Sequence, residues 1–595
     1  MILNTLKLIF RGFSRNKGAF SINLIGLSIG LASALLIYYW VDDEMKVDKF
    51  LQAENGPFEM LMHFHTEEGL STSPFTPSQL AEDLSENLPE VKHAVALRKF
   101  DNVTLAFEDK ILKADGRHAS PGFFELFQYE LIEGDPATVL MDNSSIVISD
   151  QLAIKLFNTT ENIVGKVIQC QQETPYQISG IFKSPPINAS LQFDFALSFA
   201  EFTSRNAWAL NWNYSTVSTY VALREGANLS TFNEKTADYL HSRRDENQLP
   251  TTLEARDYTD AYLFGTYENG QVAGGRIQYV RLFSLIAILI LLIACINFMN
   301  LSTAMASERS KEVGVKKVLG LSRGGLALQF LGETVMLSFI AMGLALTMVN
   351  ALLPIFSQLT GKDLVWSLDP QFLLVAMGLT VLTGLVAGSY PSLFMAAFKP
   401  ATALKGKLIV SSGSRNIRKV LVVGQFILSF MMIVAAVVVY QQLNYLQNKN
   451  LGYNKHNLLQ FDIEGKVKSD LTTFLSEVKQ MPGVKNASSI GQSLVGDRNT
   501  FIVEKWEGKT DNKNAFEMRP VNYDMIETLD VEILEGRSFS DTYGAEENKI
   551  IFNESAIAFM GLENPLGTEV AIQGTSFEII GVSKDFHFSA LREEI

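Results

Sequence analysis

Five long apolar stretches divide this chain, and they constrain its fold more than any other feature of the sequence. They cover residues 19–41, 279–303, 326–356, 371–397 and 420–440. Each stretch reaches the roughly 20 residues that an α-helix needs to cross about 30 Å of hydrocarbon. We therefore expect a membrane protein with five spanning helices.

Two stretches outside the apolar runs are long enough to fold independently. They comprise residues 42–278 and residues 441–595. Because 47% of the 595 residues are hydrophobic, the chain is too apolar for an average soluble protein and too polar to lie mostly in a membrane. We expect an α-helical transmembrane bundle that carries two α+β extracytoplasmic domains, called here the first and second outer domains.

Basic residues gather in three short segments, residues 1–18, 304–325 and 398–419. Together these segments hold 15 basic and two acidic residues, whereas the rest of the chain holds 35 basic and 62 acidic residues. Since Lys and Arg in short loops resist translocation, the three segments are expected to be cytoplasmic. Both large domains then lie outside the cytoplasm.

The N-terminal segment is predicted to lie on the membrane rather than to be a cleaved signal. Within residues 1–18, apolar residues recur at helical spacing beside Lys7, Arg11 and Arg15, as in an interfacial helix. The small residues at 32–34 resemble a signal-peptide cleavage site, but such a site normally follows the apolar core, and here the apolar run continues to Trp40. We therefore expect an uncleaved anchor.

Four segments of the second outer domain resemble segments of the first, in the same order. Residues 126–134 match 528–536, 146–153 match 550–556, 162–165 match 564–567, and 176–181 match 577–582. The offset is about 402 residues each time, which indicates an internal duplication. Because the second copy stops at the position equivalent to about residue 194, we expect a C-terminally truncated chain of an eight-span protein. The alternative is a protein that ends naturally at Ile595.

The sequence offers no strong catalytic or metal-binding motif. The nucleotide-binding pattern Gly-x-x-x-x-Gly-Lys-Ser/Thr and the zinc pattern His-Glu-x-x-His do not occur. His63 and His65 would share one face of a strand, but two histidines without a placed carboxylate are more often surface residues than metal ligands. Cys170 and Cys295 fall in an outer domain and in a span, so they are not expected to pair. We expect no catalytic residue, no metal site, no bound cofactor and no enzyme activity in this chain.

Three polar residues in the apolar runs are candidates for intramembrane coupling: Glu333, Asn297 and Asn300. Intramembrane acids are often functional, but Glu333 is close enough to the cytoplasmic end to reach the interface or to pair with a base of the preceding loop. The two asparagines, like Gly378, Gly384 and Gly388 in the fourth span, are explained more simply by helix packing. No polar row crosses any span, which argues against a solute channel.

The most informative polar element is the charged run at residues 307–320, directly after the second span. If this run only kept the loop in the cytoplasm, it would need basic residues but no particular arrangement of them. Here two glutamates lie four residues apart, the apolar Val313, Val318 and Leu319 alternate with bases, and glycines mark break points. We expect a short amphipathic helix with its apolar side toward the bundle and its charged side toward the cytosol, where a soluble partner docks. The candidate docking residues are Glu308, Arg309, Lys311, Glu312, Val313, Gly314, Lys316, Lys317, Leu319 and Gly320.

Several of these motifs resemble one family of membrane proteins. Residues 296–304 (Ile-Asn-Phe-Met-Asn-Leu-Ser-Thr-Ala), 308–320 and 329–333 (Gln-Phe-Leu-Gly-Glu) strongly resemble the FtsX/MacB-type permeases of ABC transporters. Residues 23–30 and 48–50 fit the opening of that family, and residues 451–453 fit the start of its second periplasmic core domain. The resemblance covers essentially the whole chain, in the form with two MacB-like domains.

The resemblance implies a permease of the type VII class in a bacterial inner membrane, with a cytoplasmic N-terminus and periplasmic outer domains. A separate ABC ATPase dimer, which binds ATP and Mg, would dock on the coupling helix within residues 304–325 and drive the outer domains, a mode called mechanotransmission. Such a permease exports or extracts a substrate, in some cases with a periplasmic adaptor and an outer-membrane channel; no nucleic acid is implied. The alternative is a transmembrane regulator that activates a periplasmic partner such as a cell-wall hydrolase.

Overall fold

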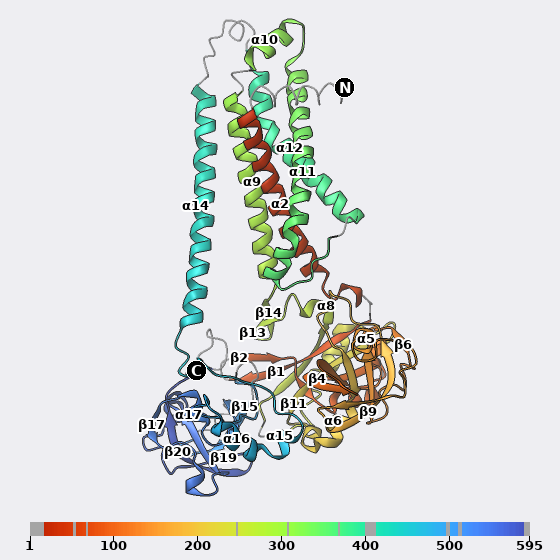
Figure 1. Ribbon diagram of the computed structural model, residues 1–595, viewed down its shortest axis with the longest axis vertical. Coiled ribbons are helices and arrows are strands. Elements are labelled where there is room, and N and C mark those ends of the chain that lie inside the picture. Colours follow the sequence, from red (N-terminus) through yellow and green to blue (C-terminus); the bar gives the residue numbers. More distant parts are fainter. Residues whose placement is uncertain are drawn as a thin grey trace. The chain divides into compact units, whose positions relative to one another are not determined.

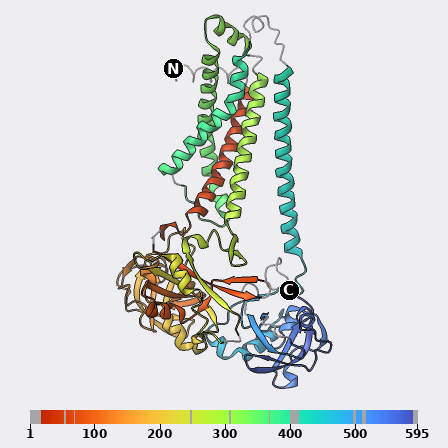
Figure 2. The same cartoon turned by 180° about the vertical axis from the view of Figure 1, so that it is seen from behind.

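The computed structural model describes residues 17–51, 55–66, 69–245, 248–305, 309–366, 369–398, 412–494, 500–509 and 515–587. Residues 1–16 of the expected interfacial helix and residues 399–411 of the expected linker lie outside this part. The chain divides into two compact units, one formed by residues 1–50 and 274–442 and the other by residues 51–273 and 443–595. The first is helical and the second is rich in strands (Figures 1 and 2).

The helical unit contains five helices that are long and apolar enough to cross a membrane, judged by length and composition within the described residues. They are α2 (Lys17–Lys46), α9 (Ile277–Met305), α11 (Arg323–Thr360), α12 (Pro370–Ala396) and α14 (Ser412–Asn448). A short helix, α10 (Ser310–Val318), lies between α9 and α11 in the sequence.

The helices overlap the five apolar runs but extend beyond them. Caps decide where α11 begins and ends: the Ser322 hydroxyl accepts a hydrogen bond from the Gly325 N–H at 3.1 Å, and Gly361 ends the helix at a φ of 65°. Polar residues at the ends of α2 and α14 continue the helix because helical backbone bonding does not require an apolar side chain.

Helices α2, α9, α11 and α12 share one apolar core. Leu27, Leu31 and Leu35 of α2 are fully buried in it. A Cβ atom on Gly384 would lie 2.7 Å from the Cα atom of Val335, so α12 and α11 approach closely there, as predicted for small residues. Gly378 contradicts that prediction, because among the described residues no atom beyond its own stretch of helix lies within 4 Å of a Cβ placed on it.

Helix α14 differs from the other four. None of the residues in its most apolar window is buried. Figures 1 and 2 both show much of its length standing apart from the other four long helices, while Leu421 and Gln425 in its first half contact the bundle. Its apolar surface is therefore available to lipid.

The first outer domain contains a 12-stranded sheet with the strand order β12-β1-β11-β4-β5-β10-β7-β9-β6 along its main path. Its strands are β1 (Phe58–Thr66), β2 (Gly69–Ser73), β3 (Thr76–Pro77), β4 (Val91–Phe107), β5 (Lys110–Ala119), β6 (Leu131–Glu133), β7 (Ser145–Ser149), β8 (Val167–Cys170), β9 (Thr174–Phe182), β10 (Phe195–Ser198), β11 (Ser215–Leu223) and β12 (Thr251–Asp257). Strands β13 (Thr266–Glu268) and β14 (Gln271–Gly274) form a separate pair.

Helices cover this sheet, and the described residues of the domain form three buried apolar clusters. The helices are α3 (Leu80–Asn87), α4 (Phe123–Leu126), α5 (Asp150–Phe157), α6 (Phe199–Arg205), α7 (Leu229–Thr236), α8 (Tyr258–Ala261) and the 3-10 helices η1 (Lys49–Leu51) and η2 (Ala207–Leu210). One cluster contains Leu105, Ile148 and Phe195, a second contains Met60 and Phe232, and a smaller third contains Phe199, Phe202 and Val217. The domain is therefore α+β, as expected.

The second outer domain contains a six-stranded sheet. Its strands are β15 (Thr500–Lys505), β16 (Ala515–Glu517), β17 (Ile533–Gly536), β18 (Lys549–Asn553), β19 (Glu569–Ile572) and β20 (Thr575–Ser583). Its helices are α15 (Lys466–Ser469), α16 (Leu471–Gln480), α17 (Met525–Leu529), η3 (Asp541–Tyr543) and α18 (Glu554–Met560). Val503, Phe552 and Ile579 lie in its core.

The sequence similarity between the outer domains corresponds to a similarity of fold. Strands β7 and β9 pair in parallel with a register shift between Ile146 and Val147. Strands β18 and β20 pair in the same way, with the shift between Ile550 and Ile551. The order helix, short strand, strand, helix, strand, strand is the same from α4 to β9 and, apart from the added η3, from α17 to β20.

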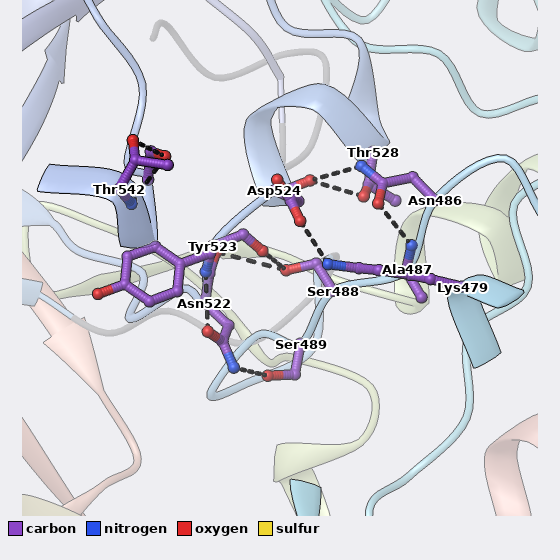
Figure 3. A network of polar contacts seen from close by, with 11 residues as sticks. Lys479, Asn486, Ala487, Ser488, Ser489, Asn522, Tyr523, Asp524, Thr528 and Thr542 are labelled. Atoms are coloured by element: carbon purple, nitrogen blue, oxygen red, sulfur yellow. Dashed lines mark hydrogen bonds and ion pairs between the residues drawn. The ribbon is translucent and has the colours of Figure 1, made fainter. Parts of the chain in front are cut away.

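A polar network stabilises the start of α17 (Figure 3). Lys479 of α16 forms an ion pair with Asp524, whose backbone adopts a φ of 64°. Nearby, the Ser488 hydroxyl donates to the Tyr523 carbonyl oxygen at 2.7 Å, and Asn522 Nδ2 donates to the Ser489 hydroxyl at 3.4 Å. Because these groups satisfy one another, the network is structural.

Candidate functional site

Helix α10 forms where the charged run predicted a helix. It begins after Arg309 and ends at Val318, and Gly320 then turns the chain at a φ of 95°, which favours glycine. Glu308, one of the candidate docking residues, lies outside the described residues.

Arg309 connects the start of α10 to α11 through an ion pair. Its Nη2 atom lies 2.9 Å from Oε2 of Glu333, and its Nε atom lies 3.5 Å from Oε2 of Glu312. The guanidinium also lies over the Phe330 ring, 4.9 Å from the ring centroid. Glu333 is buried and accepts a further hydrogen bond from Gln329 at 3.2 Å. The buried acid of the third apolar run is therefore paired with a base of the preceding segment, one of the roles predicted for it.

Lys317 connects the other end of α10 to the end of α12 through hydrogen bonds. Its ammonium donates to the carbonyl oxygens of Ala396 and Phe398, each at 2.7 Å. These carbonyls belong to a helix C-terminus, where unsatisfied acceptors favour a cation. Burial lowers the pKa of Lys317, and the charge of Arg323 lowers it further.

Glu312 and Lys316 pair along the outside of α10. Their charged atoms are 2.7 Å apart, at the i,i+4 spacing that favours such pairs. Burial raises the pKa of Glu312, but its contacts with Lys316 and Arg309 outweigh that effect and lower the pKa overall. Three of the predicted docking bases, Arg309, Lys316 and Lys317, thus have intramolecular partners.

The apolar residues of α10 and its end do not share one face. Val313 is fully buried against Leu326 and Phe330 of α11, and Gly314 is also buried. In contrast, Val318 is 66% exposed and Leu319 81% exposed. The expectation of an apolar side toward the bundle and a charged side toward the cytosol was therefore wrong for Val318 and Leu319, which are exposed. It was also wrong for Arg309 and Lys317, which contact α11 and the end of α12.

The physical reason lies in helix geometry and in the neighbours of α10. Val318 follows Val313 by five residues, which at 3.6 residues per turn places it on a different face. The surface of α11 and α12 on which α10 packs is called here the seat of α10. It provides the Glu333 carboxylate, which attracts Arg309, and the carbonyl end of α12, which attracts Lys317. The exposed surface of the segment contains Lys311, Val315, Val318, Leu319 and Gly320. We call these five residues the exposed strip.

The predicted intramembrane asparagines do not join this site. Asn297 packs beside Gly26 of α2, where an added Cβ would lie 3.4 Å from Nδ2. Asn300 Nδ2 donates to Oε1 of Gln425 on α14 at 3.5 Å. Both contacts are between helices, as the packing interpretation predicted.

Two Gly-x-Ser-x-Gly stretches, at residues 26–30 and 320–324, do not form nucleophile elbows. Ser28 lies within α2 and donates to the Leu24 carbonyl oxygen at 2.7 Å, and Ser322 caps α11. Among the described residues, no group of three or more His, Cys, Asp and Glu side chains could hold a metal ion. His63 is instead buried, with Nδ1 2.8 Å from the Thr72 hydroxyl and Nε2 3.1 Å from Glu254.

Sequence reasoning missed an ionic cluster at the other end of the bundle. Glu44 of α2 lies 3.0 Å from the Lys362 ammonium and 3.3 Å from Arg276, and Lys362 also pairs with Asp43. The sequence carried a weak signal, because the acidic triplet at residues 42–44 directly follows an apolar run. Its partners lie more than 200 residues away and could not be read from spacing.

Comparisons with known proteins agree with this architecture. The family model of the MacB-like periplasmic core domain matches residues 20–239, and that of the FtsX-like permease C-terminal region matches residues 284–400. The second match contains α10, the start of α11 and the end of α12, which together form the candidate site.

Three relatives illustrate the range of similarity. The macrolide export ATP-binding/permease protein MacB of Bdellovibrio bacteriovorus is 33% identical over 128 residues, which cover 21% of this chain and 19% of that protein. MacB of Shewanella oneidensis is 25% identical over 328 residues, covering 54% and 47% of the two chains. The uncharacterized ABC transporter permease YknZ of Bacillus subtilis is 22% identical over 353 residues, covering 57% of this chain and 83% of that protein.

The matched region spans less than half of the length of either MacB protein, and most of the length of YknZ. The two family models and these relatives confirm the family that the sequence motifs predicted. The chain therefore belongs to the FtsX/MacB-like family of ABC transporter permeases.

Proposed function

We propose that this chain is the permease subunit of an ABC transporter in which a separate cytoplasmic ATPase docks on α10. The observation that carries the proposal is the combination of a firmly seated helix with an exposed apolar surface. Arg309, Val313 and Lys317 hold α10 to α11 and α12, while Val318 and Leu319 face away from the bundle.

The exposed strip has the chemistry of a protein-docking surface. Exposed apolar side chains at a helix end offer burial to a partner, at about 25 cal/mol for each Å² removed from water. The seat makes the helix rigid, so little conformational entropy would be lost on binding. Because α10 is bound to α11 and α12, a partner that binds the exposed strip and moves would also move those two helices.

ATP hydrolysis is assigned to the partner. The chain has no Gly-x-x-x-x-Gly-Lys-Ser/Thr pattern, and its relatives include proteins named as combined ATP-binding/permease proteins. In this proposal the ATPase dimer binds ATP and Mg, and its closure moves the outer domains by mechanotransmission. The product of that movement is export or extraction of a substrate.

The proposal places the chain in a bacterial inner membrane. The three basic segments, including the N-terminus, are cytoplasmic by the positive-inside rule, and the outer domains are periplasmic. In this proposal the five long apolar helices of the described residues cross the membrane. A periplasmic adaptor and an outer-membrane channel are further partners of the proposed transporter.

The test uses Leu319→Asp and Val318→Asp, which place a charge in the exposed strip without touching the seat of α10. We expect an ABC ATPase, identified by mass spectrometry and by MgATP hydrolysis, to co-purify with the unmodified chain and at least tenfold less with either variant. Ile187→Asp is the matched control, because Ile187 is an exposed apolar residue of the first outer domain. Equal amounts of ATPase with all four chains would contradict docking on α10.

A further inference from the structure

A buried ionic cluster joins three helices. It lies at the end of α11, whereas α10 precedes the start of α11. Glu44, near the end of α2, is only 1% exposed. Its Oε1 atom lies 3.0 Å from the Lys362 ammonium and 3.3 Å from Nη1 of Arg276. Arg276 directly precedes α9, and Lys362 directly follows the Gly361 cap of α11. The cluster thus connects α2, α9 and α11.

The charges in this cluster depend on one another. A buried carboxylate is unfavourable unless a cation compensates it, and removal of one partner leaves an uncompensated buried charge. Burial lowers the pKa of Lys362, but its hydrogen bonds to Asp43 and Glu44 outweigh that effect and raise the pKa overall. Lys362 therefore stays protonated at neutral pH, opposite two carboxylates.

A neighbouring pair shows what an ordinary surface contact looks like here. Lys46 and Asp42 are 2.6 Å apart, but the Lys46 side chain is 45% exposed and both residues belong to α2. Such a surface pair contributes little. Asp42 also accepts a hydrogen bond from Gln371 Nε2 of α12 at 3.4 Å. The Lys46–Asp42 pair is a natural control for the buried cluster.

The cluster occupies a particular position in the chain. Residues 47–276, which include the first outer domain, are inserted between α2 and α9. Helix α11 is a single helix from Arg323 to Thr360, with Pro354 near its end, and is about 57 Å long at 1.5 Å per residue. In the first half of α11, Glu333 forms an ion pair with Arg309, which directly precedes α10. Beyond the end of α11, Lys362 forms an ion pair with Glu44. One helix therefore links the seat of α10 to the ionic cluster.

We propose that Lys362, Glu44 and Arg276 form a clamp that makes α11 move as one body with α2 and α9. The clamp passes a displacement of α10 to both chain segments that lead into the first outer domain. That role rests on the proposed function, whereas the clamp itself is a property of this chain alone. Lys362 acts as a positioning residue, because it acts through its ion pairs with Asp43 and Glu44.

The first experiment measures the clamp without a partner. Spin labels are placed at Tyr279 of α9 and Leu359 of α11, two exposed positions near the cluster, in chains reconstituted into lipid nanodiscs. The native cysteines are buried and contribute little labelling. We expect one narrow distance distribution for the unmodified chain, for Lys46→Gln and for Lys362→Arg. For Lys362→Gln and Glu44→Gln we expect at least a doubling of its width.

The second experiment adds the co-purifying ATPase with MgATP and vanadate. We expect Lys362→Gln to retain the ATPase in unchanged amount, because the exposed strip is intact. In the unmodified chain the separation of the two labels stays constant on trapping, whereas in Lys362→Gln it changes, since α11 moves without α9. The conservative Lys362→Arg keeps the constant separation.

The outcomes separate the two proposals. Distributions for Lys362→Gln and Glu44→Gln that stay as narrow as those of Lys46→Gln, with and without nucleotide, would overturn the clamp. Absence of any ATPase from the purified unmodified chain would count against the docking proposal, and the nucleotide-free distributions would still decide the clamp. Glu44→Gln serves as the second route if Lys362→Gln fails to fold.

Discussion

At the scale of single residues, close contacts and buried charges decide which side chains this fold tolerates. Gly134 has a φ of 108°, and a Cβ there would lie 2.7 Å from Val139 Cγ1 and 3.1 Å from Gly180 Cα. Glu201 is buried and collects three partners, with His118 Nε2 at 3.0 Å, the Tyr176 hydroxyl at 2.8 Å and Arg205 Nε at 2.5 Å. Both residues lie in the first outer domain, and both lead to predictions.

Gly134→Ala is expected to weaken the pairing of β6 with β9. The added methyl group meets backbone as well as a side chain, and overpacking of this kind costs about 1–3 kcal/mol. Hydrogen exchange of the β9 amides in the intact chain measures the effect. Gly165→Ala is the matched control, because Gly165 also has a positive φ, yet its Cβ would meet only Gln177 Nε2 at 3.8 Å. Equal acceleration in the two variants would show that backbone strain alone matters.

Acid is expected to loosen the first outer domain through Glu201. Burial raises the pKa of this carboxyl, but the contacts with His118, Tyr176 and Arg205 outweigh it, so its pKa lies below the ordinary 4.5. A folded-state pKa below the unfolded value means that the stabilisation is present above pH 4.5 and is lost as pH falls through the lowered pKa. Hydrogen exchange of β5 and β9 should therefore accelerate in that window. Glu201→Gln should be less stable at pH 7 and should show a flatter pH profile.

At the scale of elements, α10 is defined by what seats it. A short helix of nine residues is too short to be stable alone, so its contacts with α11 and α12 determine whether it forms. Two of the bases that looked like docking groups in the sequence, Arg309 and Lys317, are the ones that hold the helix to α11 and α12. Charge reversal at these positions should therefore unseat α10, and any loss of ATPase binding would follow from that.

Arg309→Glu is expected to accelerate hydrogen exchange of the α10 amides by at least about tenfold, which corresponds to about 1.4 kcal/mol of opening free energy. The reason is the loss of the pair with Glu333 and the placement of two acids together. The double variant Arg309→Glu/Glu333→Arg restores the opposite charges and should recover most of the protection. Lys311→Glu makes the same charge change on the exposed strip and should leave exchange unchanged. Failure of the double variant to recover protection would argue against the pair.

At the scale of the whole molecule, charge asymmetry orients the chain in a membrane. The basic segments and the acidic remainder predict that α10 and the outer domains lie on opposite sides. Residues suited to test this are exposed on each part: Lys311 on α10 and Ile154 on α5.

Lys311→Cys and Ile154→Cys should react with a membrane-impermeant maleimide from opposite sides of the membrane. In intact cells with a permeabilised outer membrane, we expect labelling of Ile154→Cys and not of Lys311→Cys; inverted vesicles should show the reverse. Background is low because both native cysteines are buried, and burial raises the pKa of Cys170 to about 12. Labelling of both variants from one side would contradict the proposed topology.

The sequence by itself determined the five apolar helices, the basic segments, the charged run and the family. These features are local, since hydropathy, charge and motif spacing are properties of contiguous residues. The register of β18 on β20 also agrees with the internal similarity. In contrast, the sequence did not reveal which face of α10 is exposed, and docking on that helix stays a prediction.

Tertiary structure alone decided which base pairs with Glu333 and which partners Lys317 and Glu44 take. Arg309 turns inward because Glu333 is buried within reach, and Lys317 because the carbonyl end of α12 lies there. Glu44 and Lys362 are separated by more than 300 residues, so no periodicity could connect them. A charged side chain takes the partner that compensates its lost hydration, and only the packed helices determine where that partner lies.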